Sequence, residues 1–317
     1  MSIADITEFL KNSFEGKGSP VLFAGSGFSR RYIKTPDFSG LLNSAWVQGL
    51  NDFHYYKSTF GSEGSPNYPL VALKMAEDFH ELVWRSDKYK GFREANVDFL
   101  KDRHSAFKVW ISEIIKKVNI EDTIFDNTEI ECLSKAKLDC VITTNYDILA
   151  ETIFPEYTLY IGQKDLMANR QHHIAEIYKI HGCISNPNSI IITENDYELY
   201  KEKNKYIAAK LVTLFVERPI VFIGYSMNDR HIIDLISDVS KCIENDFSKL
   251  EKNLIFINRS NGMKDDISRG YIPVETGSIP CTIIKTDDFS KIYSAFPDKS
   301  KIPADIIRSL KDNLYDI

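Results

Sequence analysis

The feature that most constrains this chain is a short apolar run, Val21 to Ala24, that leads directly into Gly25-Ser26-Gly27. An unbroken apolar run of this length is typical of a strand that is buried on both faces of a parallel sheet. Because glycine has no Cβ, the backbone N–H groups after such a strand can approach a phosphate closely. The stretch therefore predicts a strand and a turn that suits a nucleotide, although many buried strands end in Gly-x-Gly for turn geometry alone.

The residues after this turn argue against a dehydrogenase. The dinucleotide fingerprint of those enzymes would place a third Gly or Ala at position 30, where this chain has Arg30. Ser29 and Arg30 instead offer a hydroxyl and a permanent cation to a dianion. Arg30 either contacts phosphate or pairs with a surface carboxylate.

Composition narrows the class of protein further. The chain has 317 residues, of which 43% are hydrophobic, and a formal net charge of -6, which disfavours a nucleic-acid-binding surface. No apolar run reaches the roughly 18 residues of a membrane span, and there is no signal-peptide core at the N-terminus. The cysteines are scattered without a C-x-x-C pair, so neither a disulfide framework nor a zinc ribbon is indicated. We expect a cytoplasmic protein with no membrane contact and no direct nucleic acid binding.

Strand and helix patterns alternate along the chain. Strands are predicted at 21–24, 141–143, 157–161, 177–180, 189–193, 219–224, 254–258 and 282–285, with helices at 3–14, 147–154, 197–216 and 229–243 between them. Such alternation predicts an α/β fold with a doubly wound, mostly parallel, Rossmann-like sheet. We expect one domain over residues 1–317, and a terminal helix or a linker at 306–315.

A long helical stretch interrupts this alternation between the first two strands. The pattern predicts helices at 41–53, 71–83, 97–118 and 124–133, with an exposed loop at 57–68. We therefore expect a helical insertion over about 40–137 that covers one edge of the sheet.

Five polar clusters follow the predicted strands, where open parallel sheets bind ligands. They are residues 25–29, residues 143–147, His181-Gly182, residues 224–229 and Asn258-Arg259. Each has a purely structural interpretation: Asn145 or Asp147 can cap a helix, Gly224 can form a turn, and His181 can be a satisfied core histidine. A fold does not need five polar clusters along one edge, so together they predict a binding site.

The ordered set of clusters resembles the sirtuin family. Gly25-Ser26-Gly27-Phe28-Ser29 is similar to the Gly-Ala-Gly-x-Ser loop of sirtuins, and Thr35-Pro36-Asp37-Phe38 to their Pro-Asp-Phe turn. Thr143-Thr144-Asn145-Tyr146-Asp147 is similar to Thr-Gln-Asn-x-Asp. His181-Gly182 matches the catalytic His-Gly, and Asn258 resembles the Asn that contacts the adenosine ribose.

The resemblance is closer to a bacterial sirtuin-like branch, the defence-associated sirtuins. That branch's Ile-x-x-Thr-Glu-x-Asp-Tyr stands here at 190–197 and its Phe-x-Gly-Tyr-Ser-x-x-Asp at 222–229, and the whole resemblance covers roughly 18–290. The four-cysteine zinc module of deacylating sirtuins and their substrate-peptide motif after His-Gly are both missing.

The resemblance implies that NAD is a substrate rather than a hydride carrier. Nicotinamide leaves a cationic pyridinium as a neutral base, so the reaction needs an oriented nucleophile more than a strong acid. In this interpretation Asn145 positions a water molecule at the anomeric carbon. His181, since a histidine has an ordinary pKa near 6.5, would take a proton from that water or from a ribose hydroxyl.

The remaining site residues follow from the same resemblance. Asp147 would hold the nicotinamide end, and Asn258 the adenosine side. The full set expected to bind NAD is Gly25, Ser26, Gly27, Ser29, Asp37, Thr144, Asp147, Gly224, Ser226 and Asn258, with no metal.

The implied function is an NAD glycohydrolase that depletes NAD in abortive, anti-phage defence. A homo-oligomer, or a sensor or regulatory protein partner, would control its toxicity. Two alternatives stay open: an NAD-dependent protein-lysine deacylase, and a non-catalytic module that binds NAD or ADP-ribose.

Overall fold

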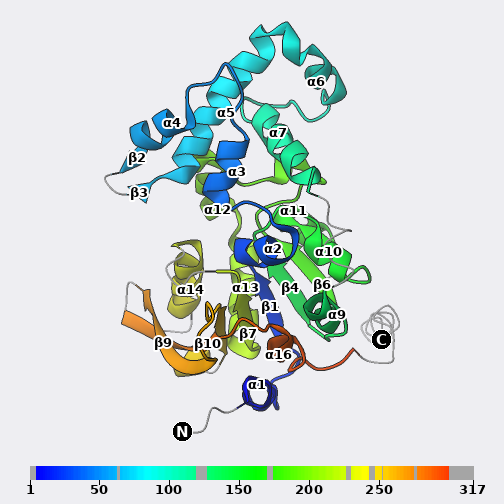
Figure 1. Ribbon diagram of the computed structural model, residues 1–317, viewed down its shortest axis with the longest axis vertical. Coiled ribbons are helices and arrows are strands. Elements are labelled where there is room, and N and C mark those ends of the chain that lie inside the picture. Colours follow the sequence, from blue (N-terminus) through cyan, green and yellow to red (C-terminus); the bar gives the residue numbers. More distant parts are fainter. Residues whose placement is uncertain are drawn as a thin grey trace.

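Eight strands form one sheet at the centre of the computed structural model, which describes residues 5–62, 65–118, 127–169, 174–225, 230–242, 247–251, 253–274 and 277–299 (Figure 1). The strand order is β5-β6-β4-β1-β7-β8-β10-β9, and every neighbouring pair is parallel except β10 and β9. The strands are β1 Val21–Ala24, β4 Cys140–Thr143, β5 Thr158–Ile161, β6 Glu176–Lys179, β7 Ile220–Ile223, β8 Leu254–Asn258, β9 Asp266–Val274 and β10 Gly277–Lys285. The predicted α/β fold with a mostly parallel sheet is confirmed.

The central strand shows why its sequence is apolar throughout. β1 pairs with β4 on one side and with β7 on the other. Leu22 and Ala24 enter one buried cluster, whereas Val21 and Phe23 enter a second cluster on the opposite face. Since both faces are covered, neither set of alternating side chains meets water.

Helices cover both faces of the sheet, as the term doubly wound implies. One face packs against α1 Ile6–Phe14, α2 Ser26–Ile33, α9 Thr128–Ser134, α10 Leu149–Ile153 and α16 Ser290–Tyr293. The other packs against α11 Gly162–Ala168, α13 Lys205–Glu217, α14 Arg230–Cys242 and α15 Ser248–Glu251. The chain passes from one side of β1 to the other between β6 and β7, so the carboxyl ends of β1 and β7 form the switch point at which such sheets bind ligands.

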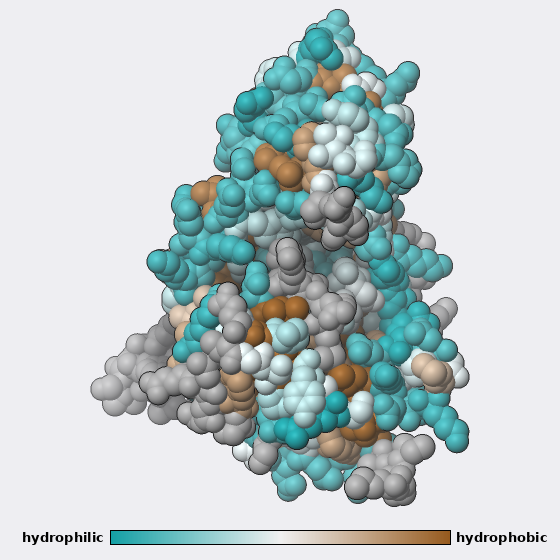
Figure 2. Space-filling model, turned by 90° about the vertical axis from the view of Figure 1, so that its left-hand side faces the viewer, coloured by the Kyte–Doolittle hydropathy of each residue, from teal (hydrophilic) through white to brown (hydrophobic). Residues whose placement is uncertain are grey.

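A separate group of helices lies beyond the carboxyl ends of the strands, at the top of Figure 1. It comprises α3 Phe38–Ser44, α4 Phe53–Thr59, α5 Tyr68–Arg85, η1 Asp87–Tyr89, α6 Lys90–Ala95 and α7 Ser105–Lys116, with a small hairpin of β2 Gly61–Ser62 and β3 Ser65–Pro66. These helices share their own buried cluster, which includes Phe79 and Phe107. Their outer surface is mainly hydrophilic with a few apolar groups (Figure 2). Because Tyr146 and Ile190 from the strand-end loops belong to the same cluster, the insertion covers the edge of the sheet where the polar clusters lie.

The predicted strand at 189–193 is wrong. This segment follows a short 3-10 helix, η2 Pro187–Ser189, and pairs with no strand in the described part of the chain. Ile190 and Ile192 are fully buried, but against the insertion rather than in the sheet. The Ile191 N–H donates to the His181 carbonyl at 3.0 Å, and the Ile192 N–H to the Asp196 carboxylate at 3.1 Å. An apolar run indicates that a segment is buried, and here the buried segment is a loop rather than a strand.

Several helix boundaries also differ from the prediction. The helix predicted at 197–216 is two helices, α12 Glu194–Lys203 and α13, which meet at Asn204. The helix predicted at 41–53 is wrong over 45–52: α3 ends at Ser44, and α4 begins only at Phe53. The helix predicted at 97–118 begins at Ser105, and the loop predicted at 57–68 contains the small hairpin.

Three further points complete the fold. β9 was not predicted, because it lies at the edge of the sheet with only part of its length buried. Residues 306–315 lie outside the described part of the chain. Among the described helices, none combines the length and the apolar character that a bilayer crossing requires.

Candidate active site

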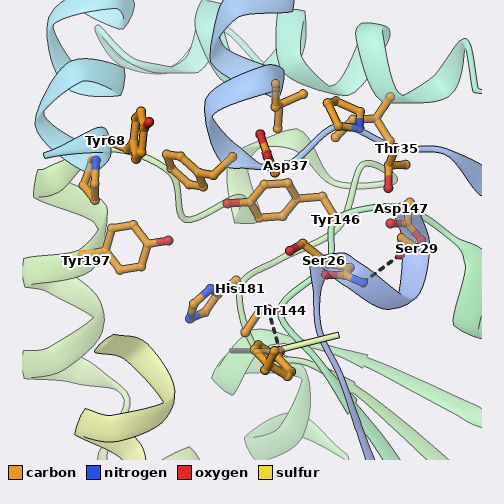
Figure 3. Close-up of a pocket in the computed structure, with 17 residues that line it drawn as sticks. Ser26, Ser29, Thr35, Asp37, Tyr68, Thr144, Tyr146, Asp147, His181 and Tyr197 are labelled. Carbon is orange, nitrogen blue, oxygen red and sulfur yellow. Dashed lines mark hydrogen bonds between the residues drawn. The ribbon is translucent and has the colours of Figure 1, made fainter. Parts of the chain in front are cut away.

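A cavity of about 270 Å³ lies between the carboxyl ends of the strands and the helical insertion (Figure 3). The loops after β1, β4 and β6 form its floor, and Tyr68 and Ile115 of the insertion contribute to its roof. The structure brings many of the predicted site residues to this cavity, namely Ser26, Ser29, Asp37, Thr144, Asn145, Asp147 and His181. Three loops that are far apart in sequence therefore meet at one place.

Other predicted site residues do not line the cavity. Gly25 follows β1, Gly27 lies in the first turn of α2, and Gly224 follows β7. Asn258 is the last residue of β8 and lines no described cavity. Ser226 lies outside the described residues.

The glycines after β1 allow two loops to pack backbone against backbone. A Cβ on Gly27 would lie 2.8 Å from Cα of Gly224, and a Cβ on Gly25 would lie 2.7 Å from the Gly224 carbonyl oxygen. The Gly25 N–H donates to the Ile223 carbonyl at 2.8 Å, and the Gly27 N–H to the Gly224 carbonyl at 3.0 Å. These two N–H groups, which the sequence suggested for phosphate, are therefore engaged within the protein. The glycines serve the close contact between β1 and β7.

Asn145 is held firmly by its side-chain amide. Its Nδ2 donates to the Gly25 carbonyl at 2.8 Å and to the Ser29 hydroxyl at 2.7 Å. Its backbone N–H donates to the Thr143 hydroxyl at 3.0 Å. Both amide hydrogens are used, and the structure gives Oδ1 no partner among the described residues. A fixed carbonyl oxygen is therefore available to accept a hydrogen bond from a molecule in the cavity.

His181 lies at the end of β6 on the same cavity, 6% exposed. Its ring meets the rings of Tyr197 and Tyr200 nearly at right angles, with centroids 5.5 and 5.2 Å away. Gly182 makes the following turn possible, because its φ is +92° and a Cβ would lie 2.2 Å from the Ser189 carbonyl oxygen. The His-Gly pair thus places an imidazole at a tight turn whose backbone contacts residues 189–191.

The two carboxylates of the cavity also have structural partners. Asp147 accepts a hydrogen bond at 3.0 Å from the N–H of Leu149, the first residue of α10, although the N-cap position of that helix is Ile148. Asp147 lines the cavity as well. Asp37 caps α3 through the Gly40 N–H at 2.8 Å and pairs with Arg30 at 2.6 Å. The Gly40 hydrogen bond and the Arg30 guanidinium hold the pKa of Asp37 below its usual value. Arg30 thus contacts a surface carboxylate, one of its two predicted roles.

Tyr225, two residues after the end of β7, connects the segments that form the floor of the cavity. The Tyr225 hydroxyl lies 2.8 Å from the Thr144 hydroxyl and donates to the Ala24 carbonyl at 3.1 Å. Three strand ends, those of β7, β4 and β1, are tied by this one side chain.

Sequence reasoning missed the tyrosines of this site. Tyr146 and Tyr197 both line the cavity, although the pattern assigned Tyr197 to helix packing. The Tyr146 hydroxyl donates to the Ile191 carbonyl at 2.6 Å and also hydrogen-bonds Tyr197. Burial, with the neighbouring Tyr197 and Asp196, raises the pKa of Tyr146 well above its usual value. The only available signal was the position of Tyr146 directly after Asn145.

A second cavity, of about 440 Å³, adjoins the first. Thr144, His181 and Tyr197 line both cavities, so these side chains lie between the two. The second cavity extends between α12, α13 and α14, where Lys201, Lys205 and Asp234 line it.

In the part of the chain that the structure describes, no three or more His, Cys, Asp or Glu side chains are grouped so that they would hold a metal ion.

Residues 139–271 match the family of SIR2-like domains, which confirms the resemblance to sirtuin-like proteins over that part of the chain. Two similar curated proteins are called NAD(+) hydrolase ThsA. The one from Cytobacillus dafuensis is 26% identical over 130 residues, 40% of this chain and 26% of that protein. The one from Bacillus cereus (strain MSX-D12) is 28% identical over 148 residues, 44% of this chain and 29% of that protein.

A third relative is Defense-associated sirtuin 2 of Bacillus subtilis. It is 30% identical over 115 residues, which is 34% of this chain and 11% of that protein. The match therefore spans less than a third of the length of each of these three relatives.

Proposed function

We propose that this protein, whose residues 139–271 match the SIR2-like domain family, is an NAD glycohydrolase that splits NAD into nicotinamide and ADP-ribose. One observation carries the proposal. An asparagine amide with both hydrogens engaged and an imidazole line the same cavity at the switch point of a doubly wound sheet. The names of two relatives, NAD(+) hydrolase ThsA, point to the same reaction.

The charges of the cavity suit the substrate end that reacts. The nicotinamide ring of NAD is a cation, and two carboxylates line the cavity. Asp37 is about half exposed and already paired with Arg30, whereas Asp147 is buried. A carboxylate in a partly enclosed site attracts a cationic ring more strongly than it would in water. The nicotinamide ribose would therefore lie with its ring toward Asp147 and its anomeric carbon near Asn145.

The reaction then needs little more than orientation. The bond between the anomeric carbon and the ring nitrogen breaks, and its electron pair neutralises the pyridinium. A water molecule forms the new bond to the same carbon and loses a proton. Oδ1 of Asn145 would accept a hydrogen bond from that water and direct a lone pair toward the carbon, since the amide itself cannot rotate away from Gly25 and Ser29.

His181 is the base in this scheme. It would take the proton of the water, directly or through a ribose hydroxyl. The edges of Tyr197 and Tyr200 pack against its ring and limit its rotation. The ADP portion would extend toward Ser26, Gly224, Ser226 and Asn258, as the sirtuin resemblance implies.

In the cell, the consequence would be NAD depletion during anti-phage defence. Support comes from the name of the relative Defense-associated sirtuin 2 and from the two NAD hydrolases. Such an activity is toxic, so we expect a cytoplasmic homo-oligomer, or a sensor or regulatory partner, to control it.

The test is to incubate the protein with NAD and to measure free nicotinamide over time. Asn145→Ala and His181→Ala are each expected to lower kcat by at least 100-fold, because positioning and proton transfer each contribute about that much. Asn96→Ala and His54→Ala, which remove the same side-chain types from the insertion, serve as controls and are expected to leave kcat unchanged. NAD that survives the wild-type protein in every oligomeric state that can be prepared contradicts the proposal. If the two site variants turn NAD over as fast as the wild type, only the roles of Asn145 and His181 are contradicted.

One observation favours a second candidate, an NAD-dependent protein-lysine deacylase. The second cavity reaches His181 from the other side and is larger than a water molecule needs. If an acylated lysine enters there, it would attack the anomeric carbon in place of water. NAD loss that depends strictly on an acylated peptide would favour this candidate.

A non-catalytic binding module is the remaining alternative. Saturable NAD binding without turnover, unchanged in His181→Ala, would favour it.

A further inference from the structure

Lys179 is a fully buried lysine at the end of β6, two residues before His181. Its ammonium group contacts the carbonyl oxygens of Tyr146, at 3.5 Å, and of Asp147. It also forms an ion pair with Glu151 at 2.8 Å and lies 3.3 Å from Sγ of Cys183. A single cation therefore has four neighbours within the protein.

Three of these neighbours, Tyr146, Asp147 and Cys183, belong to the loops after β4 and β6, both of which contribute residues to the cavity lining. Tyr146 and Asp147 directly follow Asn145, whereas Cys183 lies two residues after His181. Lys179 itself belongs to the strand that carries His181. The ammonium group thus lies between the segment that carries the amide and the segment that carries the imidazole.

The fold alone does not explain such a residue. Removing an ammonium ion from water costs several kcal/mol, and replacing a buried ion pair by hydrocarbon is often neutral or stabilising. Burial by itself would lower the pKa of Lys179, but the Glu151 carboxylate, together with Cys183 and Asp147, outweighs it and raises the pKa. The side chain therefore keeps its charge and three donor hydrogens, which an apolar residue of similar length would not offer to the two carbonyl groups.

We propose that Lys179 is a positioning residue that fixes the Asn145 loop relative to His181 by binding the carbonyl groups of residues 146 and 147. Glu151 compensates the charge from the first turn of α10. This inference rests on the proposed NAD hydrolysis for its kinetic consequence, but the mechanical coupling of the two loops stands independently of the reaction.

The experiment replaces the ion pair by hydrocarbon in the full-length protein, as the double variant Lys179→Met with Glu151→Leu, which leaves no unpaired charge. The double variant is expected to fold, with a melting temperature close to that of the wild type. Its kcat for NAD is expected to fall about 100-fold with KM within about twofold, because a displacement of about 1 Å between reacting groups has an effect of that size. Lys210→Met is the control. Lys210 lies on α13, and its ammonium is 4.7 Å from the centre of the ring of Tyr178, which belongs to β6 like Lys179. No change in kcat is expected for this variant.

Amide hydrogen exchange separates this inference from the proposed function. In the double variant, exchange is expected to accelerate together in residues 143–149 and 181–184, and in neither segment in Lys210→Met. This readout applies even if the wild-type protein does not cleave NAD. Unchanged exchange in the two segments would overturn the inference, and so would a double variant that fails to fold, since Lys179 would then serve the fold rather than the site.

Discussion

The side-chain amide of Asn145 donates a 2.7 Å hydrogen bond to the hydroxyl of Ser29, which joins the loop after β4 to the first turn of α2. The two residues are 116 positions apart in the chain. Because Nδ2 also donates to the Gly25 carbonyl, the plane of the amide is fixed by two acceptors from one segment. The orientation of the Asn145 oxygen in the cavity thus depends on residues that follow β1.

Ser29→Ala tests this dependence. The replacement removes one of the two acceptors and changes the packing only by the loss of one oxygen atom, so the amide gains rotational freedom. We expect kcat for NAD to fall about tenfold, equivalent to about 1.4 kcal/mol, and the free energy of unfolding to fall by about 1 kcal/mol, because one amide hydrogen of Asn145 loses its acceptor. Ser134→Ala, which loses an exposed hydroxyl bond to the Glu131 carbonyl, is the matched control. A wild-type kcat in Ser29→Ala would show that Gly25 suffices.

Gly27→Ala tests the backbone contact between β1 and β7. The added methyl group would lie 2.8 Å from Cα of Gly224, and backbone atoms on both sides cannot yield cheaply. We expect a loss of about 2–3 kcal/mol in the free energy of unfolding, measured by denaturant titration. Gly91→Ala, where no atom lies within 4 Å of the new Cβ on α6, is expected to be neutral or to stabilise by about 0.5–1 kcal/mol. Equal effects at the two positions would contradict the argument.

Tyr146→Phe tests the hydroxyl that ties the Asn145 loop to residue 191. The replacement leaves the partly buried Ile191 carbonyl without its 2.6 Å donor and removes the hydrogen bond between residue 146 and Tyr197. We expect a loss of about 1–3 kcal/mol in unfolding free energy. Tyr55→Phe on the exposed surface of α4 should change it by less than about 0.5 kcal/mol. Chemical denaturation measures the free energy of unfolding of both variants, and equal losses would contradict the prediction.

Lys108→Met tests how the insertion is fastened to the site. Lys108 on α7 pairs with Asp196 on α12 at 2.5 Å, and both side chains are largely buried. Breaking the pair leaves a buried carboxylate beside Tyr197, so we expect a loss of about 3 kcal/mol. Lys201→Met removes the exposed ion pair between Lys201, which lies on α12 like Asp196, and Asp234. We expect this variant to lose less than about 1 kcal/mol in the free energy of unfolding. Similar losses in the two variants would mean that the Lys108 pair is not buried in solution.

Acid should destabilise the wild-type protein in part through Glu129. Burial alone would raise the pKa of this carboxyl, but hydrogen bonds from Arg31, from the Phe289 N–H and from Tyr32 outweigh it, so the pKa is lowered. The unfolded chain therefore binds a proton to Glu129 at a higher pH than the folded protein does, and the resulting stability is lost as the pH falls below about 4.3.

Glu129→Gln isolates this contribution. The variant is expected to be less stable at pH 7, because the paired contacts of 2.6 and 2.7 Å from Arg31 lose their charge, and to lose less stability than the wild type between about pH 5 and pH 3. Glu131→Gln, on the exposed side of the same helix, is the control. Parallel stability curves for Glu129→Gln and the wild type would contradict the assignment.

Local sequence patterns predicted most of the sheet, because the strands concerned are short and apolar on both faces. β1, β4, β7 and β8 coincide closely with their predicted ranges. The same signal failed at 189–193, where Ile190 and Ile192 are equally apolar but belong to the buried cluster of the helical insertion. The hydrophobicity of a segment predicts that it is buried, but it does not predict which part of the protein covers it.

The sequence by itself determined the alternation of strands and helices, and it placed polar residues such as Asn145 and His181 at strand ends, since both are properties of short stretches of chain. Only the tertiary structure decided that Asn145 is locked by Ser29, that Tyr197 lines the cavity, and that Lys179 lies between the two loops. The reason is physical: these contacts join segments that are separated along the chain, and a hydrogen bond between them depends on distances that the packing of α2, β6 and the insertion sets.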